Sequence, residues 1–381
     1  MTILFLTHVN MMDGANRSML QLVEELRTNH GVRPIIVCPS NRPDSSFSLR
    51  QACKERGIEC HALPLVFFKQ HGSRSVLYRL RFLASMVKWN LYMAFQLRHV
   101  RFDLVHSNSS VIDMGAYLAW FRHVPHVWHL REFGNEDFGM NSVLGEKYEK
   151  WIYGKSTCAI AISKAIESKF NVFFSGRICQ IYNGIMPVEE SLCADHRNDT
   201  LTFCMVGRLE PNKNQMEALQ ALALVKSRTQ RPFRLLLVGK PSSIGYMDTL
   251  RQFIVSNGLE NDVEFMAYRS DIPQFLKRCD VGLTLSTCEA FGRVTVEYMM
   301  QNLAVIVSNT GANTEIVADG KTGLVYQLGV VEQLADRMCQ LIENRPLLTE
   351  LAANGRHYAL SHFTSCQNSD AVNDLYDTLL K

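Results

Sequence analysis

The stretch VGLTLSTCEAFGRVTVEYMM, residues 281–300, changes from the pattern of a strand to that of a helix within a few residues. Val281–Leu285 is a short apolar run of the length that suits a buried strand. A polar loop follows, and after Gly292 apolar side chains recur at helical spacing. A buried strand that leads through a loop into a helix is part of a βαβ unit, so this stretch predicts a parallel sheet covered by helices.

The same alternation runs outward through the rest of the chain. The other predicted strands are Ile3–Thr7, Pro34–Cys38, Asp103–Ser107, Pro125–Leu130, Cys158–Ile162, Ile178–Tyr182, Leu201–Val206, Phe233–Val238, Val263–Ala267 and Ala304–Val307. Helical patterns such as Asn16–Arg27 and Gln215–Ser227 lie between them. We therefore predict an α/β protein with two doubly wound domains, residues 1–185 and 186–365, and a C-terminal helix at about 366–381 that packs back on the first.

The composition is that of a folded protein. The 381 residues are 47% hydrophobic and 20% charged, which excludes intrinsic disorder, and the net charge of +3 is too small to indicate a nucleic-acid partner. The chain has no apolar run of about 18 residues, and its first residues lack the pattern of a signal peptide. Its 11 cysteines include no C-x-x-C pair, so we expect no zinc site or disulfides and a reducing, cytoplasmic compartment.

Positive charge is concentrated in the first half of the chain. Residues 1–185 carry 22 Lys and Arg against 14 Asp and Glu, a net of +8, while residues 186–381 carry 18 against 23, a net of −5. Between Glu59 and Asp103 there is no acidic residue, and the basic residues there are Lys69, Arg74, Arg79, Arg81, Lys88, Arg98 and Arg101. Aromatic residues alternate with them. Such a helical stretch suits the surface of an anionic bilayer, and the alternative is a core helix with a basic rim.

The loop that follows the strand Val281–Leu285 has the features of a phosphate site. Glu289 lies beyond the carboxyl end of that strand, and Gly292 allows a ligand to approach the backbone closely. The amides from Phe291 to Thr295 begin a helix, where unpaired N–H groups and the helix dipole favour phosphate. Glu297 lies about one turn into the helix, where its carboxylate can accept hydrogen bonds from ribose hydroxyls.

A cationic counterpart follows the strand Leu201–Val206. Arg208 leaves the end of this strand, and Lys213 follows a Pro-Asn turn at the start of the next helix. We expect both side chains to point into one cleft, where a guanidinium and an ammonium bind a diphosphate and stabilise its charge as it departs. Each motif alone is also compatible with an ordinary strand-to-helix turn that carries a surface ion pair.

Together these motifs resemble those of the retaining GT-B glycosyltransferases of family 4 (group 1). Glu289 and Glu297, with seven residues between them, resemble the E-x7-E signature, and Gly207 and Arg208 followed by Lys213 resemble the G-R…K diphosphate clamp. Further matching segments are Asn183-Gly184-Ile185, which resembles the N-G-[IV] hinge, and Gly311–Val317 and Asp319–Val325, which resemble the end of the donor domain. The resemblance implies a GT-B fold, in which two Rossmann-like domains face a central cleft.

The resemblance also implies a role for each of these residues toward a nucleotide diphosphate-sugar. Arg208 and Lys213 bind the diphosphate, Glu289 contacts the donor sugar, Glu297 holds the ribose, and Tyr268 lies where the base is cradled. The other donor-binding positions that it implies are Gly14, Ala15, Phe291, Gly292, Val294 and Thr295.

In the first domain, the segment Asp13–Ser18 resembles the family's G-G-x-x-R-S loop, with Asp13 where the family has glycine. Because a carboxylate beside a diphosphate is unfavourable, we expect Asp13 to turn toward the acceptor. His129 ends a predicted strand, where the family places a histidine beside the donor sugar, and it joins Arg208, Lys213 and Glu289 as a catalytic candidate. Weaker candidates are His8, His106 and His126. Arg131 and Glu132 are expected to orient the acceptor.

We therefore expect a hexosyltransferase that moves a sugar from a UDP- or GDP-sugar to a saccharide acceptor, lipid-linked, in bacterial cell-surface polysaccharide synthesis. The resemblance implies retention of configuration. We expect no cofactor and no metal, because Arg208 and Lys213 supply positive charge and no D-x-D pair is placed to hold an ion. The expected location is peripheral, on the cytoplasmic face of the plasma membrane. Alternatives are a nucleotide-sugar epimerase or a phosphorylase of related fold, and a non-catalytic partner subunit.

Overall fold

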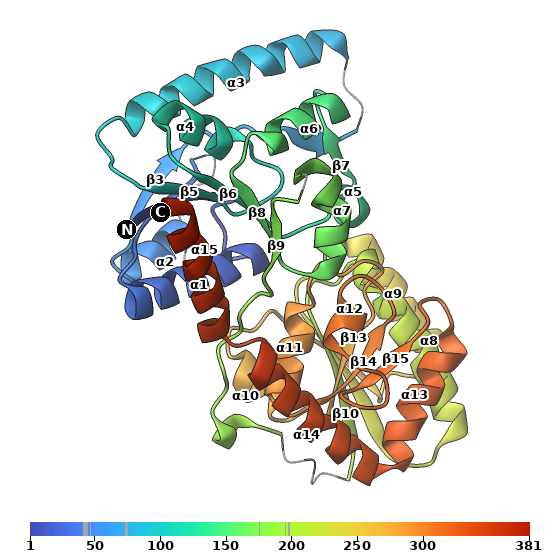
Figure 1. Cartoon of the computed structure of the whole chain (residues 1–381). Helices are drawn as coiled ribbons and strands as arrows, with labels where there is room; N and C mark the ends of the chain where they lie inside the picture. Colours follow the sequence, from blue (N-terminus) through green and yellow to red (C-terminus); the bar gives the residue numbers. More distant parts are fainter. Residues whose placement is uncertain (41–44, 46, 73–74, 175, 195, 197–198) are drawn as a thin grey trace. The chain divides into compact units, whose positions relative to one another are not determined.

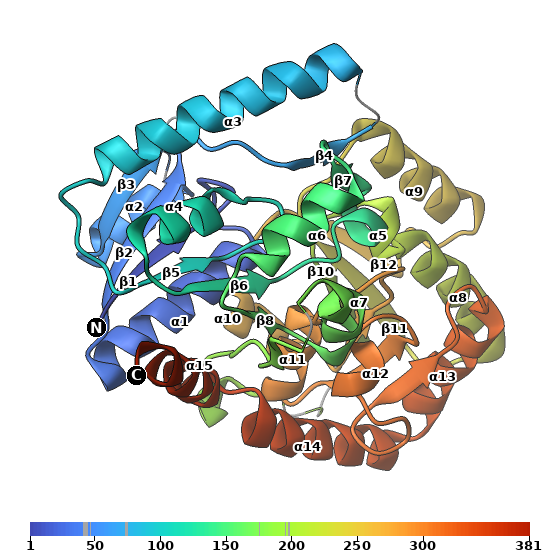
Figure 2. The ribbon, with the colours of Figure 1, turned by 45° about the horizontal axis from the view of Figure 1, so that its top comes forward.

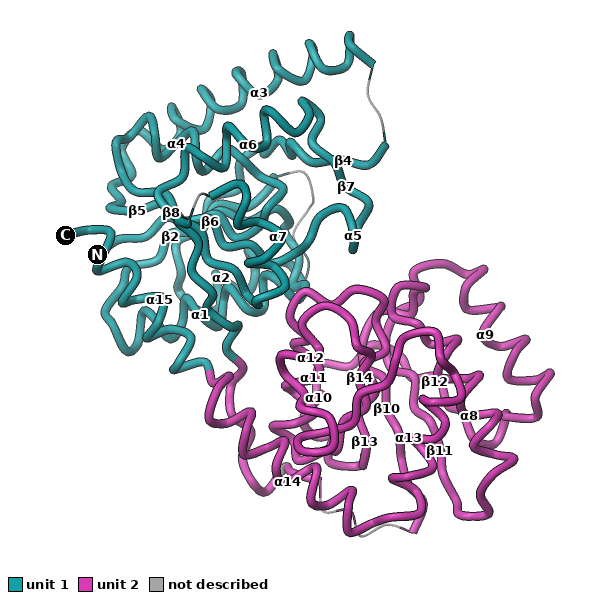
Figure 3. The backbone as a smooth tube through the Cα atoms, turned by 45° about the vertical axis from the view of Figure 1, so that its right-hand side comes forward, with its two compact units in different colours: residues 1–184, 365–381 teal, residues 185–364 magenta. Residues whose placement is uncertain are grey.

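The computed structural model describes residues 1–40, 45, 47–72, 75–174, 176–194, 196 and 199–381. The chain forms two compact units (Figure 3). Unit 1 contains residues 1–184 and 365–381, and unit 2 contains residues 185–364. Each unit is built on a parallel sheet with helices packed against it (Figure 1), so the predicted fold class is confirmed.

The sheet of unit 1 has seven parallel strands in the order β3-β2-β1-β5-β6-β8-β9. They are β1 (Thr2–Leu6), β2 (Arg33–Pro39), β3 (Glu59–Leu63), β5 (Leu104–Ser107), β6 (His126–Leu130), β8 (Cys158–Ala161) and β9 (Ile178–Gln180). The sequence pattern did not predict β3. This strand lies at the edge of the sheet and carries Glu59 and His61, so it lacks the apolar run of a buried parallel strand.

The helices of unit 1 form two apolar cores with this sheet. The first core includes side chains of α1 (Gly14–His30), α2 (Leu49–Glu55) and α15 (Ser365–Leu380), and the second includes those of α3 (Val76–Gln96) and α4 (Met114–Arg122). The remaining elements are β4 (Lys69–His71), β7 (Met140–Ser142), α5 (Asn135–Phe138), α6 (Glu146–Gly154) and α7 (Lys164–Phe174). None of the helices that the structure describes is long and apolar enough to cross a membrane.

The sheet of unit 2 has six parallel strands in the order β12-β11-β10-β13-β14-β15. They are β10 (Leu201–Val206), β11 (Phe233–Val238), β12 (Val263–Met266), β13 (Val281–Thr284), β14 (Ala304–Ser308) and β15 (Leu324–Tyr326). Its helices are α8 (Gln215–Arg228), α9 (Ile244–Ser256), α10 (Ile272–Leu276), α11 (Arg293–Met300), α12 (Asn313–Ile316), α13 (Val331–Glu343) and α14 (Arg345–His362), with 3-10 turns η1 (Glu190–Leu192) and η2 (Pro211–Lys213).

The segment without acidic residues is not one helical stretch. Its first part forms β3 and β4, and α3 begins only at Val76. Lys69 is 4% exposed, and its ammonium pairs with the Glu149 carboxylate of α6 at 2.5 Å. Phe68 beside it is fully buried. Lys69 is therefore not part of a basic surface helix, because its charge is neutralised inside unit 1. Arg74 lies outside the described residues.

Candidate functional site

The strand order of unit 2 reverses between β10 and β13. From β10 the chain builds outward through β11 to β12, and from β13 it builds in the other direction through β14 to β15. In doubly wound sheets, ligands bind beyond the carboxyl ends of the strands at such a reversal. Here the two loops are joined, because the Thr287 amide after β13 donates to the Asn212 carbonyl after β10 at 2.9 Å. Both predicted donor-binding motifs therefore lie at one place in unit 2.

Lys213 and Glu289 meet at this place although 76 residues separate them. The Lys213 Nζ donates to Glu289 Oε2 at 3.0 Å and to Ser286 Oγ at 3.3 Å, and the Gly292 amide donates to Glu289 Oε1 at 3.2 Å. Burial would raise the pKa of Glu289, but the ammonium and the hydrogen bonds outweigh burial and lower it below its usual value. The pair is thus ionised, and its Lys213 side chain remains 33% exposed to an incoming anion.

Two glycines fix the backbone around Glu289. Gly292 has φ +87° and precedes α11, and a Cβ there would lie 3.2 Å from Ile316. A Cβ on Gly311, in the loop after β14, would lie 2.1 Å from the Glu289 carbonyl oxygen, which also accepts the Ala312 amide at 2.8 Å. The loop after β14 therefore supports the loop that carries Glu289. This gives a physical reason for the Gly311–Val317 motif, which the sequence showed only by resemblance.

The first turns of α11 hold Glu297 in an ion pair that the sequence did not predict. Arg293 Nε donates to Glu297 Oε1 at 2.9 Å, one helical turn apart. The helix is anchored by Tyr298, whose hydroxyl accepts the Val206 amide at 2.7 Å and whose ring occupies the space above Gly282. The spacing of Arg293 and Glu297 is the signal that could have indicated this pair.

Three of the predicted donor-binding residues near α11 have side chains that are buried or half-buried within unit 2. Phe291 is buried with its ring centroid 5.9 Å from that of Phe363, and Thr295 Oγ1 donates to Thr284 Oγ1 at 2.9 Å. Val294 is half-buried in the first turn of α11. Because these side chains are packed within unit 2, the first amides of α11 are the groups of this segment that a ligand can use.

Arg208 lies at the same end of the sheet but pairs with a different carboxylate. Its Nη1 is 3.3 Å from Glu210 Oε2, and its side chain is 60% exposed. An exposed pair of this kind contributes at most about 1 kcal/mol, so Arg208 can turn to another anion at little cost. The structure thus places Arg208 and Lys213 in the same loop, at the carboxyl end of β10, and pairs them with different carboxylates.

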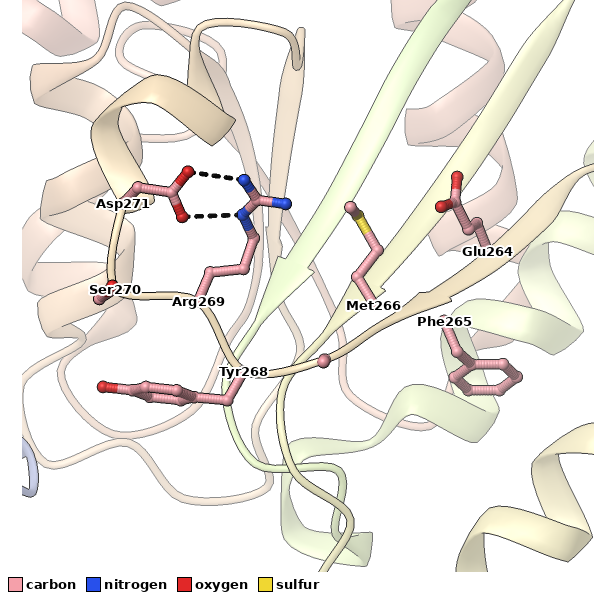
Figure 4. A pocket seen from close by; sticks show the side chains of 8 residues that line it. Glu264, Phe265, Met266, Tyr268, Arg269, Ser270 and Asp271 are labelled. Atoms are coloured by element: carbon pink, nitrogen blue, oxygen red, sulfur yellow. Dashed lines mark hydrogen bonds and ion pairs between the residues drawn. The ribbon is translucent and has the colours of Figure 1, made fainter. Parts of the chain in front are cut away.

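Tyr268 follows β12 and lines an open hollow formed by residues 264–271 (Figure 4). The hollow has a volume of about 380 Å³. Arg269 and Asp271 close one side with two parallel hydrogen bonds of 3.0 and 2.6 Å. Tyr268 is 38% exposed, and the Lys240 ammonium lies 5.4 Å from the centroid of its ring. A flat aromatic face beside a cation suits a nucleobase.

In unit 1, Asp13 caps helix α1. Its Oδ1 accepts the Asn16 amide at 2.9 Å, and its Oδ2 lies 3.6 Å from His8 Nε2. Gly14 and Ala15 begin the helix, and a Cβ added to Gly14 would have nothing within 4 Å. Helix capping explains an aspartate where the family has glycine, because the carboxylate satisfies an amide of the first turn. The expectation that Asp13 turns toward an acceptor is not needed to account for it.

His129 ends a buried chain of hydrogen bonds. The Tyr376 hydroxyl of α15 is 2.6 Å from His106 Nδ1, and His106 Nε2 is 3.1 Å from His129 Nδ1. Burial, with the Arg131 charge beside it, lowers the pKa of His129 well below its usual value, so the ring is neutral. Arg131 Nη2, 3.3 Å from His129 Nδ1, can only donate, so we assign the ring proton to Nε2.

The Nε2 of His129 has no hydrogen-bond partner among the described residues, although it is buried. A buried N–H without an acceptor is costly, and a ligand hydroxyl would satisfy it. His126, a weaker candidate, differs because its two ring nitrogens lie 2.8 Å from Ser107 Oγ and 2.9 Å from Ser156 Oγ. Its role is therefore structural.

Arg131 and Glu132 are both buried at 7% exposure and bonded within unit 1. Arg131 donates to Asn108 Oδ1 at 2.5 Å and to Asn183 Oδ1. Glu132 Oε1 accepts the Ser110 amide at 2.6 Å and two serine hydroxyls. Any effect on an acceptor is therefore indirect, through the loop after β5. The sequence pointed to neither Asn108 nor Ser110, because only the tertiary structure brings them to the end of β6.

Comparison with known families agrees with this geometry. The model described as Glycosyltransferase Family 4 matches residues 12–188, and the model described as Glycosyl transferases group 1 matches residues 194–358. The first match ends and the second begins near the boundary between the two units. The two models together span almost the whole chain.

Individual proteins are similar over much of their length. An uncharacterised glycosyltransferase of Methanocaldococcus jannaschii, MJ1178, is 27% identical over 68% of this chain and 70% of its own. The UDP-Gal:α-D-GlcNAc-diphosphoundecaprenol α-1,3-galactosyltransferase of Escherichia coli is 24% identical over 88% of this chain and 90% of its own. Alr3699/HepE of Anabaena, solved in complex with UDP, has a TM-score of 0.78 at 23% identity over 100% of both chains. The chain therefore belongs to glycosyltransferase family 4 (group 1), and it is a glycosyltransferase with the GT-B fold.

Proposed function

We propose that this chain is a retaining glycosyltransferase that moves a sugar from a UDP- or GDP-sugar to a lipid-linked saccharide in bacterial cell-surface polysaccharide synthesis. The observation that carries the proposal is the ionised Lys213–Glu289 pair beside the first turn of α11. The named acceptor of the E. coli relative, a sugar on diphosphoundecaprenol, supports the lipid-linked acceptor. The UDP and UDP-glucose complexes of HepE support the donor class.

The chemistry requires stabilisation of a leaving diphosphate. The bond between C1 of the sugar and the diphosphate oxygen breaks, and the acceptor oxygen bonds to C1 on the same face. The acceptor proton passes to an oxygen of the departing diphosphate. Lys213 and Arg208 bind this growing negative charge, and Glu289, held by the Gly292 amide, binds the sugar hydroxyls. In unit 1, the Nε2 proton of His129 is available for a hydrogen bond to a substrate hydroxyl.

We also propose that the reaction needs no metal ion. Arg208 and Lys213, both in the loop after β10, together with the first amides of α11, supply the positive field that a divalent ion would otherwise provide. Full turnover in the presence of a chelator is the expected result. Loss of turnover with EDTA and its return with Mg²⁺ or Mn²⁺ would contradict this part of the proposal.

Titration with UDP and GDP, followed by assays with the matching donors, tests the proposed function. Lys213→Ala should lower turnover about 10²-fold or more, because it removes a charge-assisted contact to the leaving group. Lys321→Ala, which removes an exposed lysine from the loop before β15, is the matched control and should leave turnover unchanged. If Lys213→Ala bound nucleotide and turned over donor as the unchanged protein does, the proposed diphosphate site would be wrong.

A further inference from the structure

Helix α3 presents a continuous apolar stripe on its outer face. Leu80, Leu83, Val87, Leu91 and Phe95 recur at intervals of three or four residues, so they share one face of the helix. Their exposed fractions are 59, 42, 60, 64 and 58%, in the same order. A solvated helix of a globular protein normally carries charged residues on this face. An apolar stripe of this length on a helix is the signature of a binding surface.

The opposite face of α3 accounts for the fold. Phe82, Met86 and Met93 are buried, and the last of them joins the core with α4 and the sheet of unit 1. Figure 1 and Figure 2 show α3 along an edge of unit 1, with α4 on its inner side. The helix therefore has two apolar faces, and packing within unit 1 occupies one of them.

The surroundings of the stripe are aromatic and basic. Arg81 and Lys88 are exposed on the helix, and the Lys88 ammonium lies over the Trp89 ring. Arg122 at the end of α4 donates to the Leu97 and Val100 carbonyls, which follow α3, and Trp120 and Phe121 precede Arg122 in the same helix. These two side chains are 70 and 60% exposed. Tryptophan, basic residues and an apolar stripe form the combination found on helices that lie in a bilayer interface.

We propose that α3, with Trp120 and Phe121, lies in the surface of an anionic lipid bilayer. Charge selects this occupant over a second copy of the chain. Two copies packed stripe to stripe would bring Arg81 and Lys88 of each together, and the chain offers no acidic residue between Glu59 and Asp103 to pair with them. Anionic headgroups supply that pairing. The inference deepens the proposed function, because an acceptor on a lipid carrier is reached only from the membrane surface.

Sedimentation with vesicles tests the inference. The full chain should pellet with vesicles of phosphatidylcholine mixed with phosphatidylglycerol and stay in solution with phosphatidylcholine alone. The triple variant Leu80→Gln, Val87→Gln and Leu91→Gln should lose most of this binding, and all three positions are exposed, so its fold should be kept. Arg81→Gln with Lys88→Gln should weaken binding mainly at low salt. Ile244→Gln with Val255→Gln, exposed apolar positions of α9, is the matched control and should bind as the unchanged chain does.

Three results would overturn the inference. These are equal binding to neutral and anionic vesicles, no binding to either, and a dimer in light scattering that the triple variant converts to a monomer. UDP titration of the triple variant separates the inference from the proposed function. If neither the unsubstituted chain nor its variants bind vesicles but all keep UDP affinity, the membrane contact of α3 is wrong and the proposed nucleotide site stands. If the unsubstituted chain does not bind UDP, the proposed function is wrong.

Discussion

The polar side chains of the two units differ in how firmly they are held. In unit 2, Lys213 and Glu289 form an ion pair in which the lysine side chain is 33% exposed and the glutamate side chain 16%. Arg208, which pairs with Glu210, is 60% exposed. In unit 1, His129 and Arg131 are 0 and 7% exposed and belong to a buried network. The unit 2 pairs can exchange a carboxylate for a ligand, whereas the unit 1 network is fixed before any ligand arrives. We therefore expect substitutions in unit 2 to affect chemistry and substitutions in unit 1 to affect positioning and stability.

The largest effect should come from Glu289→Gln. The neutral glutamine amide cannot form an ion pair with the Lys213 ammonium, and it binds a sugar hydroxyl less strongly than a carboxylate does. Turnover should therefore fall about 10²-fold or more, with nucleotide affinity retained. Glu297→Gln should instead weaken UDP affinity about tenfold, because its carboxylate is proposed to hold the ribose. Steady-state kinetics and UDP titration of both variants measure the difference. Equal losses in turnover with unchanged UDP affinity would contradict the two assignments.

Gly311→Ala should disturb the same site without touching a charged group. Its Cβ would overlap the Glu289 carbonyl oxygen at 2.1 Å, so the loop must move, at a cost of about 1–3 kcal/mol in the free energy of unfolding. Turnover should fall with it. Gly320→Ala is the matched control, because Gly320 also has a positive φ but has nothing within 4 Å of a Cβ. Urea unfolding and kinetics of both variants check this, and equal behaviour would mean that the loop after β14 does not support Glu289.

Acid should destabilise unit 1 through its buried histidines. Burial lowers the pKa of His126 to about 3, while in the unfolded chain it is about 6.5. Between these values the unfolded state binds a proton that the folded state does not, so stability falls as pH drops, by at most about 1.4 kcal/mol per pH unit. Urea unfolding at several pH values measures this slope, and His126→Gln should reduce it by up to about 1.4 kcal/mol per pH unit, the contribution of one proton. His99→Gln, at an exposed position, should not.

The smallest effect should come from Tyr376→Phe, which removes the hydroxyl at the start of the chain to His129. We expect turnover to fall about threefold, at a cost of about 1 kcal/mol in stability, with UDP affinity unchanged. Tyr153→Phe removes a buried hydroxyl bonded to the Ser110 carbonyl at 2.9 Å and should lower stability alone. A loss of turnover that is equal in the two variants would show that Tyr376 acts only through stability.

Most of the strands that the sequence predicted have continuous apolar runs and are largely buried, as β1, β2 and β10 are. The edge strands β9 and β12 were also predicted, although they are not fully buried. The edge strands β3 and β15 were missed, since β3 carries polar residues and β15 has only three residues. Sequence also identified Lys213 and Glu289, but it could not show that they pair, because their contact depends on the order of strands in the sheet.

Two further features differ in whether the sequence could have predicted them. The N-cap role of Asp13 was within reach, since aspartate before a helical pattern is a start signal. The exposed stripe of α3 was not, because a helix that is apolar on two faces does not indicate which of them a core will cover.

The position of α15 has a consequence for the order in which the chain is synthesised. Unit 2 is continuous in sequence, from residue 185 to residue 364, whereas unit 1 takes its last helix from residues 365–381. A ribosome therefore delivers all of unit 2 before it delivers Val372 and Tyr376, two buried residues of the unit 1 core. Because domains fold as units during synthesis, we expect unit 2 to finish folding first. A chain released before Tyr376 would lack the hydrogen-bond partner of His106, while the loops that carry Lys213 and Glu289 would already be complete.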